Sequence, residues 1–146
     1  MKDFFECSLR YEKNMDSGVI KKVTDKYLVD ALSFTEAESR IISEVSKCVR
    51  GELVVRSIRR TRISEIFFNK TDKTDLRWFV AKIKFIMLDE RTQKERITRA
   101  QVMVEAESID DAHENIIKSM RGTLCDYNVE SITESAIVDV ILYKSE

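Results

Sequence analysis

Apolar residues alternate with other residues in Phe4-Phe5-Glu6-Cys7-Ser8-Leu9-Arg10-Tyr11, and the alternation returns 74 residues later in Trp78-Phe79-Val80-Ala81-Lys82-Ile83-Lys84-Phe85. A period of two is the pattern of a β-strand that lies with one face on a core. Further segments match at this shift or at one residue more: 29–33 with 104–108, and 55–58 with 129–132. Because the matches follow the same order through both halves, we interpret them as an internal duplication.

Each half predicts the order strand, strand, helix, strand, strand. In the first half, strands near 4–12 and up to about Asp30 are separated by a turn at 14–18, which contains Asn, Asp, Ser and Gly. The strands that follow the two helices are expected at four places: 52–60, 62–69, 126–132 and 136–143. The polar segment 69–75 predicts a hairpin loop between the two repeats, because it is too short for a domain linker.

Both predicted helices begin at a capping box, in which a serine oxygen accepts a hydrogen bond from the third helical N–H and an acidic side chain reaches back. The boxes are Ser33-Phe34-Thr35-Glu36 and Ser108-Ile109-Asp110-Asp111. Apolar residues follow at helical spacing, and Gly51 and Gly122 are placed to end the helices. The expected apolar stripes are Phe34, Ala37, Ile41, Val45 and Cys48 in the first helix, and Ile109, Ala112, Ile116 and Met120 in the second.

These elements predict an α+β fold with about eight antiparallel strands and two helices related by a pseudo-twofold axis. We expect one domain, 1–146, built from two repeats, 1–72 and 73–146. A single repeat of about 70 residues would be marginally stable alone, so the two are expected to share a core.

Composition narrows the class of protein. The 146 residues are 43% hydrophobic and 35% charged, which suits a globular domain and excludes a disordered or collagen-like chain. No apolar run reaches the roughly 20 residues of a membrane span, and the N-terminus lacks a signal-peptide core. The three widely spaced cysteines, Cys7, Cys48 and Cys125, form neither a disulfide framework nor a zinc pattern. We therefore expect a cytoplasmic protein with no membrane contact.

No enzyme motif is recognisable. Three glycines leave no room for a nucleotide-binding or nucleophile-elbow signature. The single histidine, His113, lies at the edge of the second helical stripe and has no second histidine with which to bind a metal. Asp30 and Glu105 occupy equivalent positions and could pair as acid and base, although acidic residues near helix starts also favour the helix dipole. We expect a protein that is not an enzyme and has no cofactor, no catalytic residues and no metal site.

Charge is distributed unevenly along the chain. Residues 1–101 carry 22 basic and 16 acidic side chains, whereas residues 102–146 carry 3 and 10. The stretch Arg56-Ser57-Ile58-Arg59-Arg60-Thr61-Arg62 is densely basic, and its equivalent after the shift of 74 is Glu130-Ser131-Ile132-Thr133-Glu134-Ser135-Ala136. The alternation was kept while the charge was inverted.

Two interpretations of this inversion stay open. In the first, two hairpins lie close across the pseudo-twofold axis and Arg56 or Arg60 pairs with Glu130 or Glu134, or else both are solvated faces. In the second, the arginines form a basic surface for an anionic partner, most plausibly nucleic acid. The candidate phosphate contacts are then Arg56, Arg59, Arg60, Arg62, Lys82 and Lys84.

Aromatic residues complete that hypothetical surface. If Phe79, Ala81, Ile83 and Phe85 face the core, then Trp78 faces outward with Lys82 and Lys84, and Phe4 holds the position equivalent to Trp78. An indole on an open sheet could stack on a base of a single strand while the ammonium groups contact phosphates. Alternation alone leaves a second possibility, in which Trp78 and Phe4 lie under a helix or in an interface.

Three stretches carry a resemblance: F-F-E-C-S-L-R-Y-E-K (4–13), Y-L-V-D-A-L-S-F-T-E-A-E-S-R-I-I (27–42) and R-G-T-L-C-D-Y-N-V-E-S-I-T-E-S-A-I-V-D-V (121–140). In general character the chain resembles an uncharacterised family of short Bacteroidetes and phage proteins, a domain of unknown function. The resemblance implies a stand-alone cytoplasmic protein of bacterial, phage or mobile-element origin and assigns no residue a role. Read from residue 52, four strands and a helix are also similar to the unit of PUR-type and Whirly-type single-strand binders, an analogy of fold alone.

The sequence thus favours a non-enzymatic binding module that contacts single-stranded nucleic acid through a basic and aromatic sheet surface. The alternative is a protein-interaction or assembly module that binds a protein partner or associates with itself through sheet edges. An enzyme acting on a small molecule would need a pocket with perturbed carboxylates, which a sequence does not display.

Overall fold

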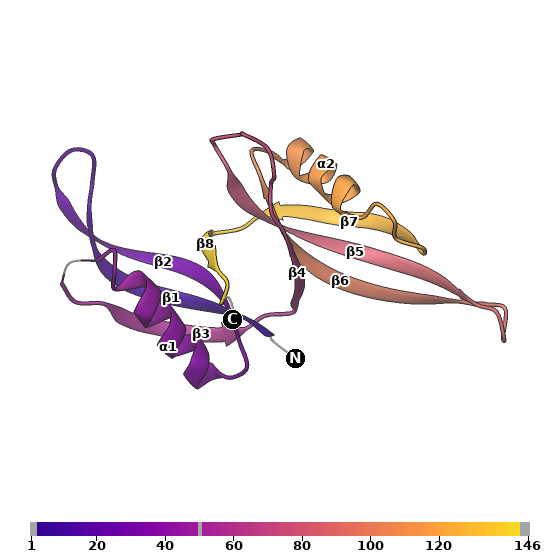
Figure 1. Ribbon diagram of the computed structural model, residues 1–146, viewed down its shortest axis with the longest axis horizontal. Coiled ribbons are helices and arrows are strands. Elements are labelled where there is room, and N and C mark those ends of the chain that lie inside the picture. Colours follow the sequence, from indigo (N-terminus) through magenta and orange to yellow (C-terminus); the bar gives the residue numbers. More distant parts are fainter. Residues whose placement is uncertain (1–2, 50, 144–146) are drawn as a thin grey trace. The chain divides into compact units, whose positions relative to one another are not determined.

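The computed structural model describes residues 3–49 and 51–143, and in this part of the chain it contains eight strands and two helices (Figure 1). The α+β class and the numbers of strands and helices are confirmed. The chain divides into two compact units. The first contains the residues up to Thr61 together with those from Ala136 onward, and the second contains Arg62–Ser135. A single domain built from repeats 1–72 and 73–146, related by duplication, stays a prediction.

The first unit contains a four-stranded sheet in the order β3-β1-β2-β8, with α1 on one face (Figure 1). The β1–β2 and β1–β3 pairs are antiparallel, and the β2–β8 pair is parallel. Its core lies between the sheet and the helix and includes Phe5, Cys7, Leu9 and Ile41, each 0% exposed. The elements are β1 (Asp3–Asn14), β2 (Ile20–Ala31), α1 (Phe34–Val45), β3 (Val54–Arg60) and β8 (Ile137–Ile141).

The second unit repeats this arrangement with the strand order β4-β6-β5-β7, and α2 covers one face of the sheet (Figure 1). Here the β4–β6 pair is parallel and the other pairs are antiparallel. Phe79, Ala81, Ile83 and Ile116 pack in its core. The elements are β4 (Ile63–Phe67), β5 (Arg77–Asp89), β6 (Lys94–Ala106), α2 (Ile109–Ser119) and β7 (Asp126–Glu134).

The predicted helix starts are confirmed at the serine caps. Ser33 Oγ accepts a hydrogen bond from Glu36 N at 3.1 Å, and Ser108 Oγ accepts one from Asp111 N at 3.1 Å. The Glu36 carboxylate forms an ion pair with Arg40 one turn later. These caps satisfy N–H groups that have no partner inside the helix.

The predicted helix ends are wrong by a few residues. The helices end at Val45 and Ser119, before Gly51 and Gly122, which lie in the following turns at φ +97° and +88°. Cys48 is exposed and is not part of the core stripe, because the last buried residue of α1 is Val45.

The predicted pairing of the late strands is also wrong. β3 and β4 follow one another in the chain but belong to different sheets, as do β7 and β8. A two-residue hairpin needs residues such as Asn-Gly that adopt positive φ, and the connecting pairs are Thr61-Arg62 and Ser135-Ala136. Segment 69–75 does not close a hairpin either, because β4 pairs with β6 and not with β5. The four strands and helix read from residue 52 are therefore divided between two sheets.

Candidate nucleic-acid interface

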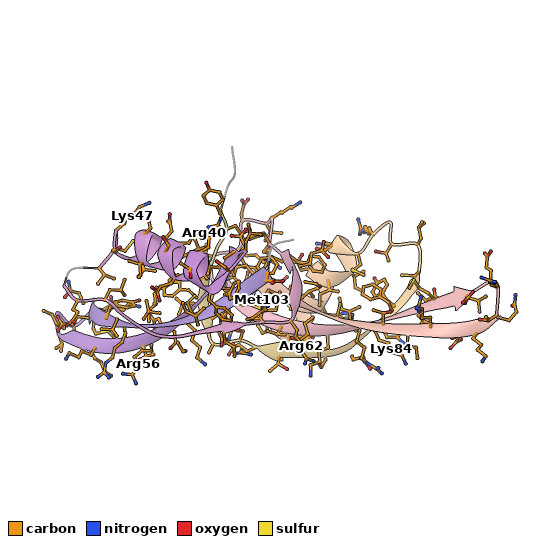
Figure 2. The ribbon with its side chains drawn as sticks, turned by 90° about the horizontal axis from the view of Figure 1, so that it is seen from below. Arg40, Lys47, Arg56, Arg62, Lys84 and Met103 are labelled. Carbon is orange, nitrogen blue, oxygen red and sulfur yellow. The ribbon has the colours of Figure 1, made fainter. Side chains whose placement is uncertain are left out.

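Each sheet has one face covered by its helix and one face without a helix. In the second unit, α2 packs on the side of Phe79, Ala81 and Ile83. Because side chains alternate along a strand, Lys82 and Lys84 of β5 point to the opposite face. Lys82 is exposed and Lys84 is half-buried. Figure 2 shows Lys84 and Arg62 on the side of this sheet away from its helix.

Strand β6 adds a further cation beside the two lysines. Gln101 is the cross-strand partner of Lys82, and Arg99 is the partner of Lys84. A shallow hollow of about 260 Å³ is lined by Arg62, Lys82, Arg99, Ala100 and Gln101. We call the four cations Arg62, Lys82, Lys84 and Arg99 the cationic face. Arg99 was missed in the sequence, although the alternation of β6 places residue 99 on the same face as residue 101.

One carboxylate forms an ion pair with a cation of the cationic face, and a second, Asp126 of β7, lies at its border as the cross-strand partner of Ile86. Glu130 of β7 accepts a hydrogen bond from Arg99 Nε at 3.0 Å. The β5–β7 register shifts between Lys82 and Ile83, which leaves Glu130 as the extra residue of a β-bulge. Within the described ranges, Arg62, Lys82 and Lys84 form no ion pair. The cationic face therefore has more positive charge than its neighbours neutralise.

In the first unit, the corresponding face holds two of the predicted arginines. The β1–β3 register shifts between Ser8 and Leu9, so that Arg56 is the extra residue of a bulge. Arg56 is exposed, and Figure 2 shows it on the side of the sheet away from α1, whereas Arg40 and Lys47 lie on the helix side. Arg59 is neutralised by Glu6, with Nη2 and Oε2 2.9 Å apart.

Arg60 does not belong to the open face. Its guanidinium carbon lies 5.4 Å from the ring centre of Phe5 and 5.5 Å from that of Phe34, on the side covered by α1. Its Nε is 3.3 Å from Asp3 Oδ2. The expectation that Arg60 joins Arg56 and Arg59 on one surface is wrong, because side chains of adjacent residues on a strand point to opposite faces.

The predicted stacking platform is not formed by Trp78. The indole is 5% exposed and packs edge-on against Phe68, with ring centres 5.6 Å apart. Of the two possibilities that alternation left open for Trp78, the exposed one is therefore wrong and the buried one holds, because Phe68 packs against the indole. Phe4 is half-buried, and its carbonyl oxygen accepts hydrogen bonds from Thr61 N and Oγ1. The indole of Trp78 therefore has no free face for a base.

The acidic residues of β7 pair within their own sheet. Glu130 bonds to Arg99, and Glu134 forms an ion pair with Arg77. Each of the two carboxylates thus has a basic partner in its own sheet, and a pairing of Glu130 or Glu134 with Arg56 or Arg60 stays a prediction. Cross-strand neighbours in one sheet are close enough to meet, and these contacts occupy the carboxylates.

The carboxylates considered for catalysis take part in local structure. Asp30 is 5% exposed, accepts a hydrogen bond from Tyr143 N at 2.8 Å and lies beside Arg40. Glu105 accepts a hydrogen bond from Asn69 N at 3.1 Å. His113 is exposed. In the part of the chain that the structure describes, no group of three or more His, Cys, Asp or Glu residues is arranged to hold a metal ion.

At the start of α2, one carboxylate has several partners. Asp111 forms an ion pair with Lys73 and accepts hydrogen bonds from Asn69 Nδ2 at 3.2 Å and Glu107 N at 3.0 Å. The Lys73 contact, followed by the Glu107 N–H, lowers the pKa of Asp111, and the same contact raises the pKa of Lys73. A carboxyl that is ionised and bonded in this way fixes a loop to a helix and is not available as a proton donor.

Comparison with known proteins identifies the family but no activity. The family model described as Domain of unknown function (DUF4494) matches residues 3–143, nearly the whole chain. This confirms the resemblance to a family of unknown function. No curated protein and no solved structure matches the chain. Among the described residues, no helix is long and apolar enough to cross a membrane.

Proposed function

We propose that this chain, which belongs to the DUF4494 family of unknown function, is a non-enzymatic binding module that contacts single-stranded nucleic acid through its cationic face. The supporting observation is a shallow hollow lined by Arg62, Lys82 and Arg99, with Lys84 beside it as the cross-strand partner of Arg99. Within the described residues, only Arg99 of these four cations is in an ion pair. Phosphates of a nucleic acid would neutralise these cations and release bound counterions, which favours association.

The shape of the face suits an extended ligand. Strands β5 and β6 and Arg62, the residue before β4, contribute to the surface, so its cations form a shallow patch across neighbouring strands rather than a deep pocket. Single-strand binders commonly combine such a basic surface with contacts to the exposed bases. In the first unit, considered by itself, Arg56 is an exposed cation on the face without a helix.

Fluorescence anisotropy with a labelled single-stranded oligonucleotide at several salt concentrations tests the proposal. We expect binding that weakens as the salt concentration rises. The K82Q/K84Q variant should bind more weakly, and the slope of its log affinity against log salt concentration should be smaller by about one to two, the loss of one to two phosphate contacts. The matched control is K47Q, since Lys47 is an exposed lysine on the helix side. No binding at micromolar protein, or equal losses in K82Q/K84Q and K47Q, would overturn the proposal.

A second candidate function is protein assembly. It is supported by β7, a nine-residue strand at the end of its sheet whose strand partner is β5. The backbone groups of a terminal strand can pair with a strand of another protein or of a second copy of the chain. Light scattering at low and high salt tests this: a mass above that of a monomer supports assembly, and a monomer at high protein concentration contradicts it.

The proposal extends to origin and location. We propose a cytoplasmic protein from a bacterium, phage or mobile element that has no membrane role. The free thiols of Cys7, Cys48 and Cys125 support a reducing compartment, because structural disulfides are typical of oxidising ones. Fractionation of cells that express the protein from its own promoter would check this location.

A further inference from the structure

The face that carries the cations continues into an apolar surface toward the tip of the β5–β6 hairpin. Ile86 and Leu88 share the face of Lys82 and Lys84, because they follow at every second position of β5. On β6, Ile97 shares the face of Arg99 and is the cross-strand partner of Ile86. We call Ile86, Leu88 and Ile97 the aliphatic step.

The aliphatic step is open to solvent. Leu88 is 60% exposed, Ile97 is 47% exposed and Ile86 is half-buried. The reason lies in the lengths of the strands: β7 pairs with β5 only as far as Ile86, and β4 pairs with β6 only from Gln101 onward. Beyond these points the hairpin has two strands, and neither neighbour shields its apolar side chains.

In the first unit the cross-strand pair at the equivalent place is polar, although Ile20, two positions before Lys22 on the same face, is 64% exposed. There the partners on the open face are Glu12 and Lys22, which stand where the second unit has Ile86 and Ile97. A polar pair is therefore compatible with this hairpin geometry. The apolar pair of the second unit is not required by the fold, and a ligand that contacts it would explain its presence.

We infer that the bases of a bound single strand pack on the aliphatic step while its phosphates contact the cationic face. This inference rests on the proposed function and names the part of the ligand that each group of side chains recognises. A polyanion that also offers flat apolar surfaces complements a row of cations followed by aliphatic side chains. Unpaired bases offer such surfaces, whereas the bases of a duplex are stacked on one another. Aliphatic contacts do not distinguish one base from another, so binding is expected to be insensitive to sequence.

Contact with the bases, which the sequence analysis assigned to Trp78, is thereby assigned to side chains at the opposite end of β5. Along this face of the strand, side chains change from the buried Trp78 through Lys82 and Lys84 to the exposed Leu88. Aliphatic side chains give a weaker base contact than an aromatic ring. The preference for a strand with bases is therefore expected to be modest.

The test compares oligo-dT with an abasic strand of equal length, which has the same phosphates and no bases. The natural chain is expected to bind oligo-dT about 5- to 20-fold more tightly than the abasic strand, the amount that covering two aliphatic side chains would supply. L88Q/I97Q is expected to lose this preference and to keep its affinity for the abasic strand.

The matched control is M87Q. Met87 is 42% exposed on the same hairpin, but it faces the other side because it lies between Ile86 and Leu88. M87Q should retain the preference for oligo-dT. Thermal melting of each variant shows that the exposed substitutions leave the fold intact.

The outcomes separate the inference from the proposed function. Salt-dependent binding with equal affinity for both strands, or an L88Q/I97Q variant that keeps its preference, overturns the aliphatic step and leaves phosphate binding standing. Absence of binding to either strand overturns both. An acidic peptide that binds more tightly than oligo-dT and loses affinity in L88Q/I97Q also overturns the inference, because the step would then serve a protein.

Discussion

The two units share one strand order and one helix position, but their uncovered faces differ. Each sheet has three antiparallel strands and one parallel strand from the other half of the sequence. On the uncovered faces, Arg56 is the bulged residue in the first unit and Glu130 is the bulged residue in the second. The fold therefore accepts a bulged residue of either charge. The sign of the charge on these faces is not fixed by the fold, so it can differ with the ligand that each face binds.

The sides facing the helices differ as well. In the first unit the Tyr11 hydroxyl donates a hydrogen bond to the Asp25 carboxylate, and it lies 3.0 Å from the Tyr27 hydroxyl. At the equivalent positions the second unit has Phe85, Ala100 and Val102. A hydrogen-bonded polar group can thus replace apolar packing at the margin of a core when its members satisfy one another.

The largest predicted change in stability tests which unit is stabilised by β4, a strand that follows the first helix. Phe67 belongs to the first half of the sequence but packs in the core of the second unit. F67A should lower the free energy of unfolding by about 3–5 kcal/mol. Hydrogen exchange should show the first loss of protection in β6, at residues 102–104, which pair with β4. The control is I58A in β3, which should loosen β1. Loss of protection in β1 with F67A while β6 stays protected would contradict the strand assignment.

A smaller effect is expected from the polar group of the first unit. Burial, followed by the hydrogen bond to Asp25, raises the pKa of Tyr11. Y11F should cost about 1–2 kcal/mol at neutral pH, because Asp25 and Tyr27 lose a partner.

The same variant should change the response to alkali. Because the folded-state pKa of Tyr11 is raised, its contribution to stability is complete below the unfolded value of about 10 and declines as pH rises above it. Denaturant titrations between pH 8 and 11 should therefore show a shallower loss of stability in Y11F than in the natural chain. Equal alkaline slopes in the two proteins would show that this phenol does not couple to folding.

The smallest predicted change in stability concerns Glu130, the bulged residue of the second unit. The Arg99–Glu130 pair is exposed, and E130Q should change the free energy of unfolding by less than about 1 kcal/mol. Removing this carboxylate frees Arg99, so affinity for a single strand at low salt should rise about two- to fivefold. The control is E134Q, which alters the Glu134–Arg77 pair. An unchanged or lower affinity in E130Q would remove Arg99 from the proposed interface.

Much of the fold follows from local patterns. The alternation in 4–11 and 78–85 identified β1 and β5, and the serine caps identified the starts of both helices. These predictions succeed because each depends on residues within one strand or one helical turn. The candidate site was predicted in part: Lys82 and Lys84 lie on an uncovered face, while Arg60 lies on the helix side and Trp78 is buried.

Which segments form strands and helices, and which side chains of a strand share a face, followed from the order of the amino acids alone. Three features became apparent from the folded chain: β4 and β8 join the sheets of the opposite halves of the sequence, Glu130 pairs with Arg99, and Trp78 is buried. The difference lies in the distance along the sequence over which each signal acts. Periodicity and capping depend on residues that are near neighbours in the chain. Strand partners and burial depend on contacts between residues tens of positions apart. The same alternating pattern is compatible with several strand orders, so it does not select one of them.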